Sequence, residues 1–216
     1  MGEVVSFKTR VAQQVSHYAL GFQTVFVDYE YLVCSKAFTE KPFYIVTAKQ
    51  DNYMHLTGIP FKDAQLFFNK CVNGLLTETD IVFIKKRQSE SEVKGSIRRK
   101  ITVLPNLINL FSKSLMAEES FSKNRVICSF GTSDGICTVG FTLTDRDEPA
   151  VKPMTLLLKS ELDKAKSKPV DLILRRKTGD SKFDTLIFGN ADSINTYWSS
   201  INSLLSDNLI KLAERH

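Results

Sequence analysis

Apolar residues recur every three to four positions in four segments of the chain, which is the spacing of one face of an α-helix. These segments span residues 4–20, 62–75, 97–115 and 191–213. Asp63 stands at the start of the second segment, where its charge suits the positive end of a helix dipole. Pro105 interrupts the third segment, so we expect a kink or a new helix there. The sequence therefore predicts helices near both ends and in the first half.

Alternation of apolar and polar residues, typical of half-buried strands, begins after the first helix. Residues 25–33 place five apolar or aromatic side chains on one face, with Asp28 and Glu30 on the other. Residues 43–48 predict a second strand, antiparallel to the first. Residues 53–57 predict a third, short extended segment, which Gly58 and Pro60 end.

The later half of the chain predicts paired strands joined by turns. Residues 125–130 and 136–143 form one expected hairpin across the turn sequence TSDG. Residues 154–158 predict a further strand, and 170–176 and 183–188 a second hairpin around the sequence KTGDS. We find no internal repeat, clear linker or apolar run long enough to cross a bilayer. The expectation is a single α+β domain over residues 1–216, with amphipathic helices packed on a mainly antiparallel sheet.

The cysteines and the overall composition favour an intracellular protein without a metal. The 43% hydrophobic and 25% charged fractions are ordinary for a soluble chain. Cys34, Cys71, Cys128 and Cys137 form no CxxC pair, and the chain has only three histidines. We therefore expect buried free thiols in a reducing compartment, no metal site, and a cytoplasmic location.

Positive charge is concentrated between residues 85 and 100. This segment holds two glutamates and seven basic residues, so it alone accounts for the net charge of +5 of the whole chain. The basic residues are Lys85, Lys86, Arg87, Lys94, Arg98, Arg99 and Lys100. Such a run is either a solvated loop or a contact with a polyanion, and charge alone favours the loop.

His55 is the first candidate for chemistry. The chain has no P-loop, GxGxxG, HExxH or GxSxG pattern, which argues against nucleotide-dependent enzymes and serine hydrolases. Imidazole is the side chain best suited to proton transfer near neutral pH. Strand alternation would place Tyr53, His55 and Thr57 on one polar face. For a lone histidine the commoner case is a surface residue, or one hydrogen-bonded at a strand end.

A second cluster surrounds the KTGDS turn, where Arg175, Arg176, Lys177 and Lys182 lie close in sequence. The planar fork of arginine suits phosphate oxygens. Adjacent arginines on a strand face opposite sides, so only one of them can join a given site. The competing interpretation is a charged hairpin tip that keeps the protein soluble.

These residues are compatible with RNA cleavage that needs no metal or other cofactor. Such cleavage requires a base for the 2′-hydroxyl, an acid for the leaving oxygen and fixed positive charge for the transition state. Histidine, threonine or tyrosine, and arginine or lysine supply these groups.

The segment NYMHLTGIPFKDAQLFFNKCVNGLL, residues 52–76, resembles the opening motif of a phage-associated nuclease family grouped with barnase, EndoU, the tRNase colicins and RelE. Its members carry His-Leu-Thr-Gly, then a helix with an aromatic and cysteine pattern, and later a Pro-x-[Ser/Thr]-Leu-Leu element. Pro153 and Thr155 stand in that later element, and His55 and Thr57 in the first motif. The resemblance spans about 43–189, with 4–34 and 191–213 as additions.

The resemblance implies a barnase/EndoU/RelE-like fold and a ribonuclease that acts as a toxin or defence effector in a phage-related or mobile element. RNA would be the substrate, and an antitoxin or phage protein a partner. Within this hypothesis His55 is the general acid or base, Thr57 or Tyr53 positions the substrate, and Arg175 or Lys177 stabilises the transition state. The basic set that would contact RNA is Lys85, Lys86, Arg87, Arg98, Arg99 and Lys100, with Thr155, Lys177 and Lys182.

A second hypothesis is a catalytically inactive protein that binds a partner or senses a phage component on the same fold. The net charge is low for a protein that holds RNA, and no second acid–base residue stands out in the sequence.

Overall fold

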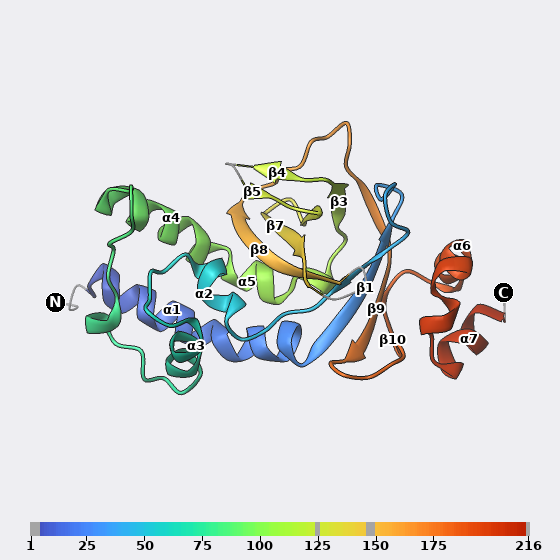
Figure 1. The fold of residues 1–216 in the computed structure, drawn as a ribbon, viewed down its shortest axis with the longest axis horizontal. Helices are drawn as coiled ribbons and strands as arrows, with labels where there is room; N and C mark the ends of the chain where they lie inside the picture. Colours follow the sequence, from blue (N-terminus) through green and yellow to red (C-terminus); the bar gives the residue numbers. More distant parts are fainter. Residues whose placement is uncertain (1–4, 124–125, 146–149, 215–216) are drawn as a thin grey trace.

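A closed β-barrel forms the centre of the molecule, as a computed structural model of residues 5–123, 126–145 and 150–214 shows (Figure 1). Around the ring the strand order is β1-β2-β8-β7-β6-β3-β9, and β9 pairs back with β1. β2 and β8 run parallel, whereas the other neighbours in the ring are antiparallel. The strands are β1 (Tyr29–Ser35), β2 (Tyr44–Val46), β3 (Met116–Glu119), β6 (Phe130–Ser133), β7 (Cys137–Leu143), β8 (Ala150–Leu158) and β9 (Lys168–Lys177).

Helices cover the barrel from two opposite ends of the molecule (Figure 1). On the N-terminal side lie α1 (Phe7–Phe22), α2 (Asn52–Thr57), α3 (Ala64–Val72), α4 (Glu90–Thr102) and α5 (Leu104–Ile108), with the short helices η1 (Gln23–Val27), η2 (Glu78–Asp80) and η3 (Leu110–Ser112). On the C-terminal side lie α6 (Ala191–Ile201), η4 (Asn202–Leu204) and α7 (Asp207–Glu214). Outside the ring, β10 (Thr185–Phe188) pairs with β9, and β4 (Ser122–Lys123) pairs with β5 (Val126–Ile127).

Two apolar cores hold these layers together. The larger core joins the barrel to α1–α5 and contains a stack of the Tyr44, Phe130 and Phe141 rings, with centroids 4.8–4.9 Å apart. The smaller core lies between β1, β9 and the C-terminal helices, where Leu32 and Leu174 meet the buried faces of α6 and α7. β1 and β9 are thus buried on both faces, which explains their largely apolar sequences.

Several predicted elements are confirmed. β2 is antiparallel to β1, and β9 and β10 form the hairpin around KTGDS. β6 and β7 also form a hairpin, but its first strand is Phe130–Ser133 and not 125–130, because Val126 and Ile127 pair with β4 instead. α3 begins after Asp63, whose carboxylate accepts a hydrogen bond from the Leu66 amide at 2.6 Å. A new helix, α5, begins at Leu104 and has Pro105 in its first turn, as the interruption predicted. The predicted starts of the first helix at residue 4 and of strand 125–130 lie outside the described residues.

The first predicted strand is wrong in its start and in its exposure. α1 continues as a π-helical turn through Val27, because Phe26 stacks on Phe22 and packs against Phe111 in the main core. This burial overrides the strand preference of the β-branched residues there. Glu30 is not on a solvated face but is buried with Arg176, so the expectation of a half-buried strand fails.

The sheet is mainly antiparallel, as predicted, but it is closed, and the prediction of a single C-terminal helix is wrong. The sheet closes into a barrel because β9 pairs with β1 over seven residue pairs. The C-terminal segment divides into α6, η4 and α7, with Leu205 buried between them. Where a nuclease core begins and ends stays a prediction, but β1, placed among the additions, is one of the ring strands.

The four cysteines are free and buried, as predicted. Burial raises the pKa of the Cys128 thiol to about 11 and those of Cys71 and Cys137 to about 12. None of the helices in the described ranges is long and apolar enough to cross a membrane.

Candidate active site

Residues 53–57, which the sequence predicts to be extended, form most of the short helix α2. A five-residue alternation does not distinguish a strand from one and a half helical turns. Tyr53, Leu56 and Thr57 are completely buried, at the i, i+3, i+4 spacing of a helix face, while His55 is exposed. α2 packs against α1, α3, α4 and β8. The tertiary packing of that face therefore decides the structure.

The predicted placement of Tyr53 and Thr57 beside His55 is wrong. The Tyr53 hydroxyl donates a hydrogen bond to the Val15 carbonyl oxygen of α1 at 2.7 Å. The Thr57 hydroxyl donates to the Met54 carbonyl oxygen at 2.9 Å. Both hydroxyls lie inside the fold and serve the helix and its packing, so neither faces a substrate.

Gly58 ends α2 and makes room for a lysine. Its φ of 73° lies in the left-handed region, which glycine adopts without strain. A Cβ at this position would lie 2.8 Å from Cδ of Lys100. The Lys100 side chain passes over Gly58, and its Nζ donates to the carbonyl oxygens of Leu56, at 3.2 Å, and His55, at 3.4 Å. Lys100 of α4 thereby caps the negative end of α2.

The electrostatics of this cap are unusual for a lysine. Burial, with a smaller contribution from the charge of Lys85, lowers the pKa of Lys100 from 10.5 to about 8. Lys100 therefore changes charge in a range where most lysines stay protonated. Two ammonium groups thus lie close together beside the C-terminus of α2.

His55 lines a small pocket on the other side of Gly58. The pocket has a volume of about 260 Å³ and is bounded by Met54, His55, Gly58, Ile59, Pro60, Phe61 and Lys85. His55 and Lys85 contribute its ionisable groups, and apolar side chains form much of the wall. An imidazole and an ammonium in one pocket can bind an anion and move a proton.

The basic segment is more ordered than the favoured solvated loop. Residues from Glu90 onward are helical, and a capping box starts α4: the Glu92 carboxylate accepts from the Ser89 amide at 2.7 Å. Ahead of it, a tight turn pairs Lys85 with Gln88. Lys86, Arg87 and Arg99 are exposed. The interpretation of this segment as a loop is thus wrong for residues 90–100. Most of the basic side chains of residues 85–100 do face solvent.

The other predicted site residues do not join His55. Arg175 lies on β9 with its guanidinium 4.4 Å from the centroid of the Tyr29 ring. Arg175 is not among the residues that line the His55 pocket, so the predicted combination of the two in one site is wrong. Lys182 donates to the Ser203 carbonyl oxygen, and Lys177 is exposed at the end of β9.

The prediction that Thr155 contacts RNA is also wrong, because the residue is buried. Only 8% of Thr155 is exposed. Its Cγ2 would lie 2.9 Å from a Cβ on Gly140, so its methyl group fills the space above that glycine. Thr155 therefore packs against Gly140 of the neighbouring strand β7.

Comparison with known families decides the class of the protein. The model of the family described as phage-Barnase-EndoU-ColicinE5/D-RelE like nuclease4 matches residues 15–197. The chain belongs to this nuclease family. The match includes β1 and much of α1 and α6, which the resemblance in the sequence had left out. No significant match was found among curated proteins or solved structures.

Within this nuclease family member, sequence reasoning took Gly58 only as the end of an extended segment, and it missed the role of Gly58 as a helix C-cap and the capping role of Lys100. A signal for the first was present: a glycine directly after an apolar helical pattern is a common helix C-cap. No local signal could place Lys100, because 42 residues separate it from Gly58. In the described part of the chain, no group of three or more His, Cys, Asp or Glu side chains could hold a metal ion.

Proposed function

We propose that the protein is a metal-independent endoribonuclease whose active site is the pocket at His55. The observation that carries the proposal is the exposed His55 imidazole sharing a pocket with Lys85, next to the Lys100 cap. Membership of the nuclease family supports the reaction class. The His-Leu-Thr-Gly segment supplies His55 itself and the Gly58 turn that admits Lys100.

In this mechanism His55 acts as the general base on RNA. It takes the proton of a 2′-hydroxyl, whose oxygen then forms a bond to the adjacent phosphorus. The bond from phosphorus to the 5′-oxygen breaks, water protonates that oxygen, and the hydroxide so formed takes the proton back from His55. The products are a 2′,3′-cyclic phosphate and a 5′-hydroxyl. Lys85 stabilises the charge that develops on the phosphate oxygens. DNA lacks the 2′-hydroxyl and is not a substrate.

Lys100 is a positioning residue in this proposal. It does not line the pocket, but it holds the two carbonyl groups that end α2 and thereby the backbone of His55. We extend the proposal to a cytoplasmic toxin or anti-phage effector from a phage-related element, controlled by an antitoxin or a phage protein. The four buried free thiols agree with a reducing compartment.

The test is expression of wild type, His55→Ala and Lys85→Ala under tight induction, followed by growth and total RNA integrity. We expect RNA fragmentation by the wild type and its loss in both variants. His17→Ala is the matched control, because His17 is also exposed on a helix but does not line the His55 pocket. Cleavage by the purified wild type should persist in EDTA. Full cleavage by His55→Ala would refute the assignment.

A catalytically inactive binding or phage-sensing protein is the second candidate. The observation that favours it is that Tyr53 and Thr57 are buried and that Arg175 does not line the pocket, which leaves Lys85 as the other ionisable group there. Purified wild type that leaves single-stranded RNA intact, with and without infection of the cells it came from, would favour this candidate.

A further inference from the structure

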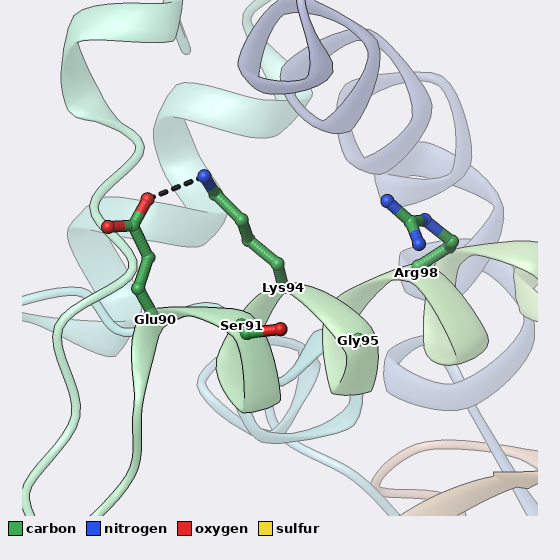
Figure 2. A pocket seen from close by; sticks show the side chains of 5 residues that line it. All are labelled: Glu90, Ser91, Lys94, Gly95 and Arg98. Atoms are coloured by element: carbon green, nitrogen blue, oxygen red, sulfur yellow. Dashed lines mark ion pairs between the residues drawn. The ribbon is translucent and has the colours of Figure 1, made fainter.

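A groove runs along the outer end of α4, away from the His55 pocket. Figure 2 shows Lys94 and Arg98 extending from the same side of this helix, one turn apart, with Gly95 between them. A hollow of about 480 Å³ lies here, bounded by Glu90, Ser91, Lys94, Gly95 and Arg98. A second hollow of about 360 Å³ adjoins it, sharing Lys94 and reaching Phe7, Lys8 and Phe83. We call these two hollows together the α4 groove.

Four cations surround two aromatic rings in and beside the α4 groove. The Phe7 and Phe83 rings lie with centroids 5.6 Å apart. Over Phe83 lie the ammonium groups of Lys94, at 5.0 Å, and Lys8, at 6.0 Å. Over Phe7 lie the guanidinium groups of Arg98, at 5.1 Å, and Arg10, at 5.8 Å. The rings hold these charges in place without neutralising them.

Acidic residues do not cancel this charge. Glu78 accepts hydrogen bonds from the hydroxyls of Ser6, at 2.9 Å, and Thr9, at 2.7 Å, which attaches η2 to the start of α1. Glu90 pairs with Lys94 at 2.5 Å, but 64% of the Glu90 side chain is exposed. Exposed pairs of this kind contribute little, so Lys94 can exchange Glu90 for another anion. The groove keeps a surplus of positive charge.

α4 connects the groove to the His55 pocket. Arg98 lies over Phe7 of α1 and Lys94 over Phe83, while Lys100 reaches α2. Six residues separate Lys94 from Lys100, which is roughly 9 Å along the helix axis. One continuous helix thus carries both the groove cations and the lysine beneath the pocket. Phe83 lines the groove and Lys85 lines the His55 pocket, so a segment of three residues joins the two.

We propose that the α4 groove binds the ribose-phosphate backbone of single-stranded RNA and delivers it to the His55 pocket. The proposal rests on the proposed endoribonuclease function and identifies its substrate class. Preorganised cations in a row suit successive phosphates. A single strand is required because attack by a 2′-hydroxyl needs an in-line geometry at phosphorus that an A-form duplex does not provide.

Binding is tested in a His55→Ala background, where RNA stays whole. Fluorescence anisotropy of a labelled single-stranded RNA gives the Kd for this protein and for the same protein with Lys94→Gln and Arg98→Gln. Lys164→Gln with Lys166→Gln is the control, because both lysines are exposed in the β8–β9 loop and the charge change is the same. A second pair, Lys8→Gln with Arg10→Gln, tests the α1 side.

We expect each groove pair to raise Kd tenfold or more at low salt and the control pair to change it less than threefold. The slope of log K against log salt should fall by about 1.4 for two lost contacts with a single strand. Thermal melts verify that the variants remain folded. Groove variants that match the control in Kd and slope would overturn the proposal and leave an acidic protein as the occupant. Equal affinity for a duplex would overturn the single-strand assignment.

Cleavage separates this proposal from the proposed function. With His55 intact, the ratio of kcat/KM for a long RNA to that for a dinucleotide should fall at least tenfold in the groove variants. An unchanged ratio would contradict delivery through the groove. If wild type cleaves neither substrate, the endoribonuclease assignment fails, while the anisotropy experiment still decides whether the groove binds RNA.

Discussion

Gly58 shows how much one residue contributes to the candidate site. It ends α2 with a positive φ, and its missing side chain leaves the space that Lys100 occupies. Without that space the ammonium could not reach the Leu56 carbonyl oxygen. The glycine of the His-Leu-Thr-Gly segment thus allows the contact between α2 and α4. The contribution of this contact to stability can be measured separately from the cost of a positive φ.

Gly58→Ala should destabilise the protein more than Gly74→Ala does. Both glycines have positive φ, 73° and 66°, which costs an alanine about 1–2 kcal/mol. A Cβ at Gly74 has open space, whereas one at Gly58 meets Lys100. We expect roughly 1 kcal/mol of additional loss for Gly58→Ala, measured by urea unfolding. Equal losses would show that Lys100 moves aside freely.

Lys100 should make stability depend on pH in the alkaline range. Its folded pKa of about 8 lies below the ordinary 10.5, so between these values the unfolded chain binds more protons. Stability contributed through this group therefore rises with pH across that window, by at most roughly 3 kcal/mol. Lys100→Met removes the titration. The difference in unfolding free energy, wild type minus variant, should increase from pH 8 to 10.5, and a flat difference would contradict the burial of the ammonium.

At the scale of elements, α4 explains why a highly charged segment is helical. The capping box of Ser89 and Glu92 starts it, with Glu90 and Glu92 in the first turn and Arg99 and Lys100 in the last. This order places negative charge at the positive end of the helix dipole and positive charge at the negative end. Val93 and Ile97 bury one face. The same helix then positions the groove and the cap of α2.

Ser89→Ala should weaken α4 and the functions assigned to it. The Ser89 hydroxyl accepts from the Glu92 amide at 3.3 Å and donates to the Glu92 carboxylate at 2.8 Å. Loss of such an N-cap costs about 1 kcal/mol. Ser91→Ala, in the exposed first turn of the same helix, is the control and should cost less than half as much. Thermal melts compare the two, and equal melting temperatures would rule out a capping contribution.

At the scale of the whole molecule, the pairing of β1 with β9 closes the barrel. Arg176 of β9 donates from Nε to the Glu30 carboxylate of β1 at 2.9 Å, and its Nη2 lies 2.8 Å from the same oxygen. Both residues are at most 5% exposed. The pair lies on the barrel face that the C-terminal helices cover, and Arg176 also contacts the Phe183 ring there. Closure and the smaller core are therefore coupled.

Arg176→Met should destabilise the protein by roughly 3–5 kcal/mol, because Glu30 stays buried without the opposite charge of Arg176. The double variant Glu30→Met with Arg176→Met should lose less than Arg176→Met alone, since no buried charge then remains. Denaturant unfolding of wild type, the two single variants Glu30→Met and Arg176→Met, and the double variant gives a double-mutant cycle for the pair. Additive losses would show that the two side chains act independently.

The sequence by itself determined helix 62–75, the positions of the two late turns and the family. Helix 62–75, the restart at Pro105 and the TSDG and KTGDS turns depend on residues close together in the chain, and local periodicity and turn chemistry record such contacts directly. The same holds for residues 52–76, whose order alone carries the family resemblance that the family match confirms. The sequence also identified His55 as a candidate site residue, although it predicted an extended segment there instead of the helix α2.

Only the tertiary structure decided how the candidate site and the barrel are built. A five-residue pattern at 53–57 fits two periods, and burial of Tyr53 against Val15 selected the helix. The closure of β1 on β9 joins residues 146 positions apart, and the cap of Lys100 on Leu56 joins residues 44 apart. The periodicity of apolar residues indicates which side chains are buried, but it does not indicate which residues they contact. Those partners follow from packing of the whole chain, where shape and burial outweigh local preference.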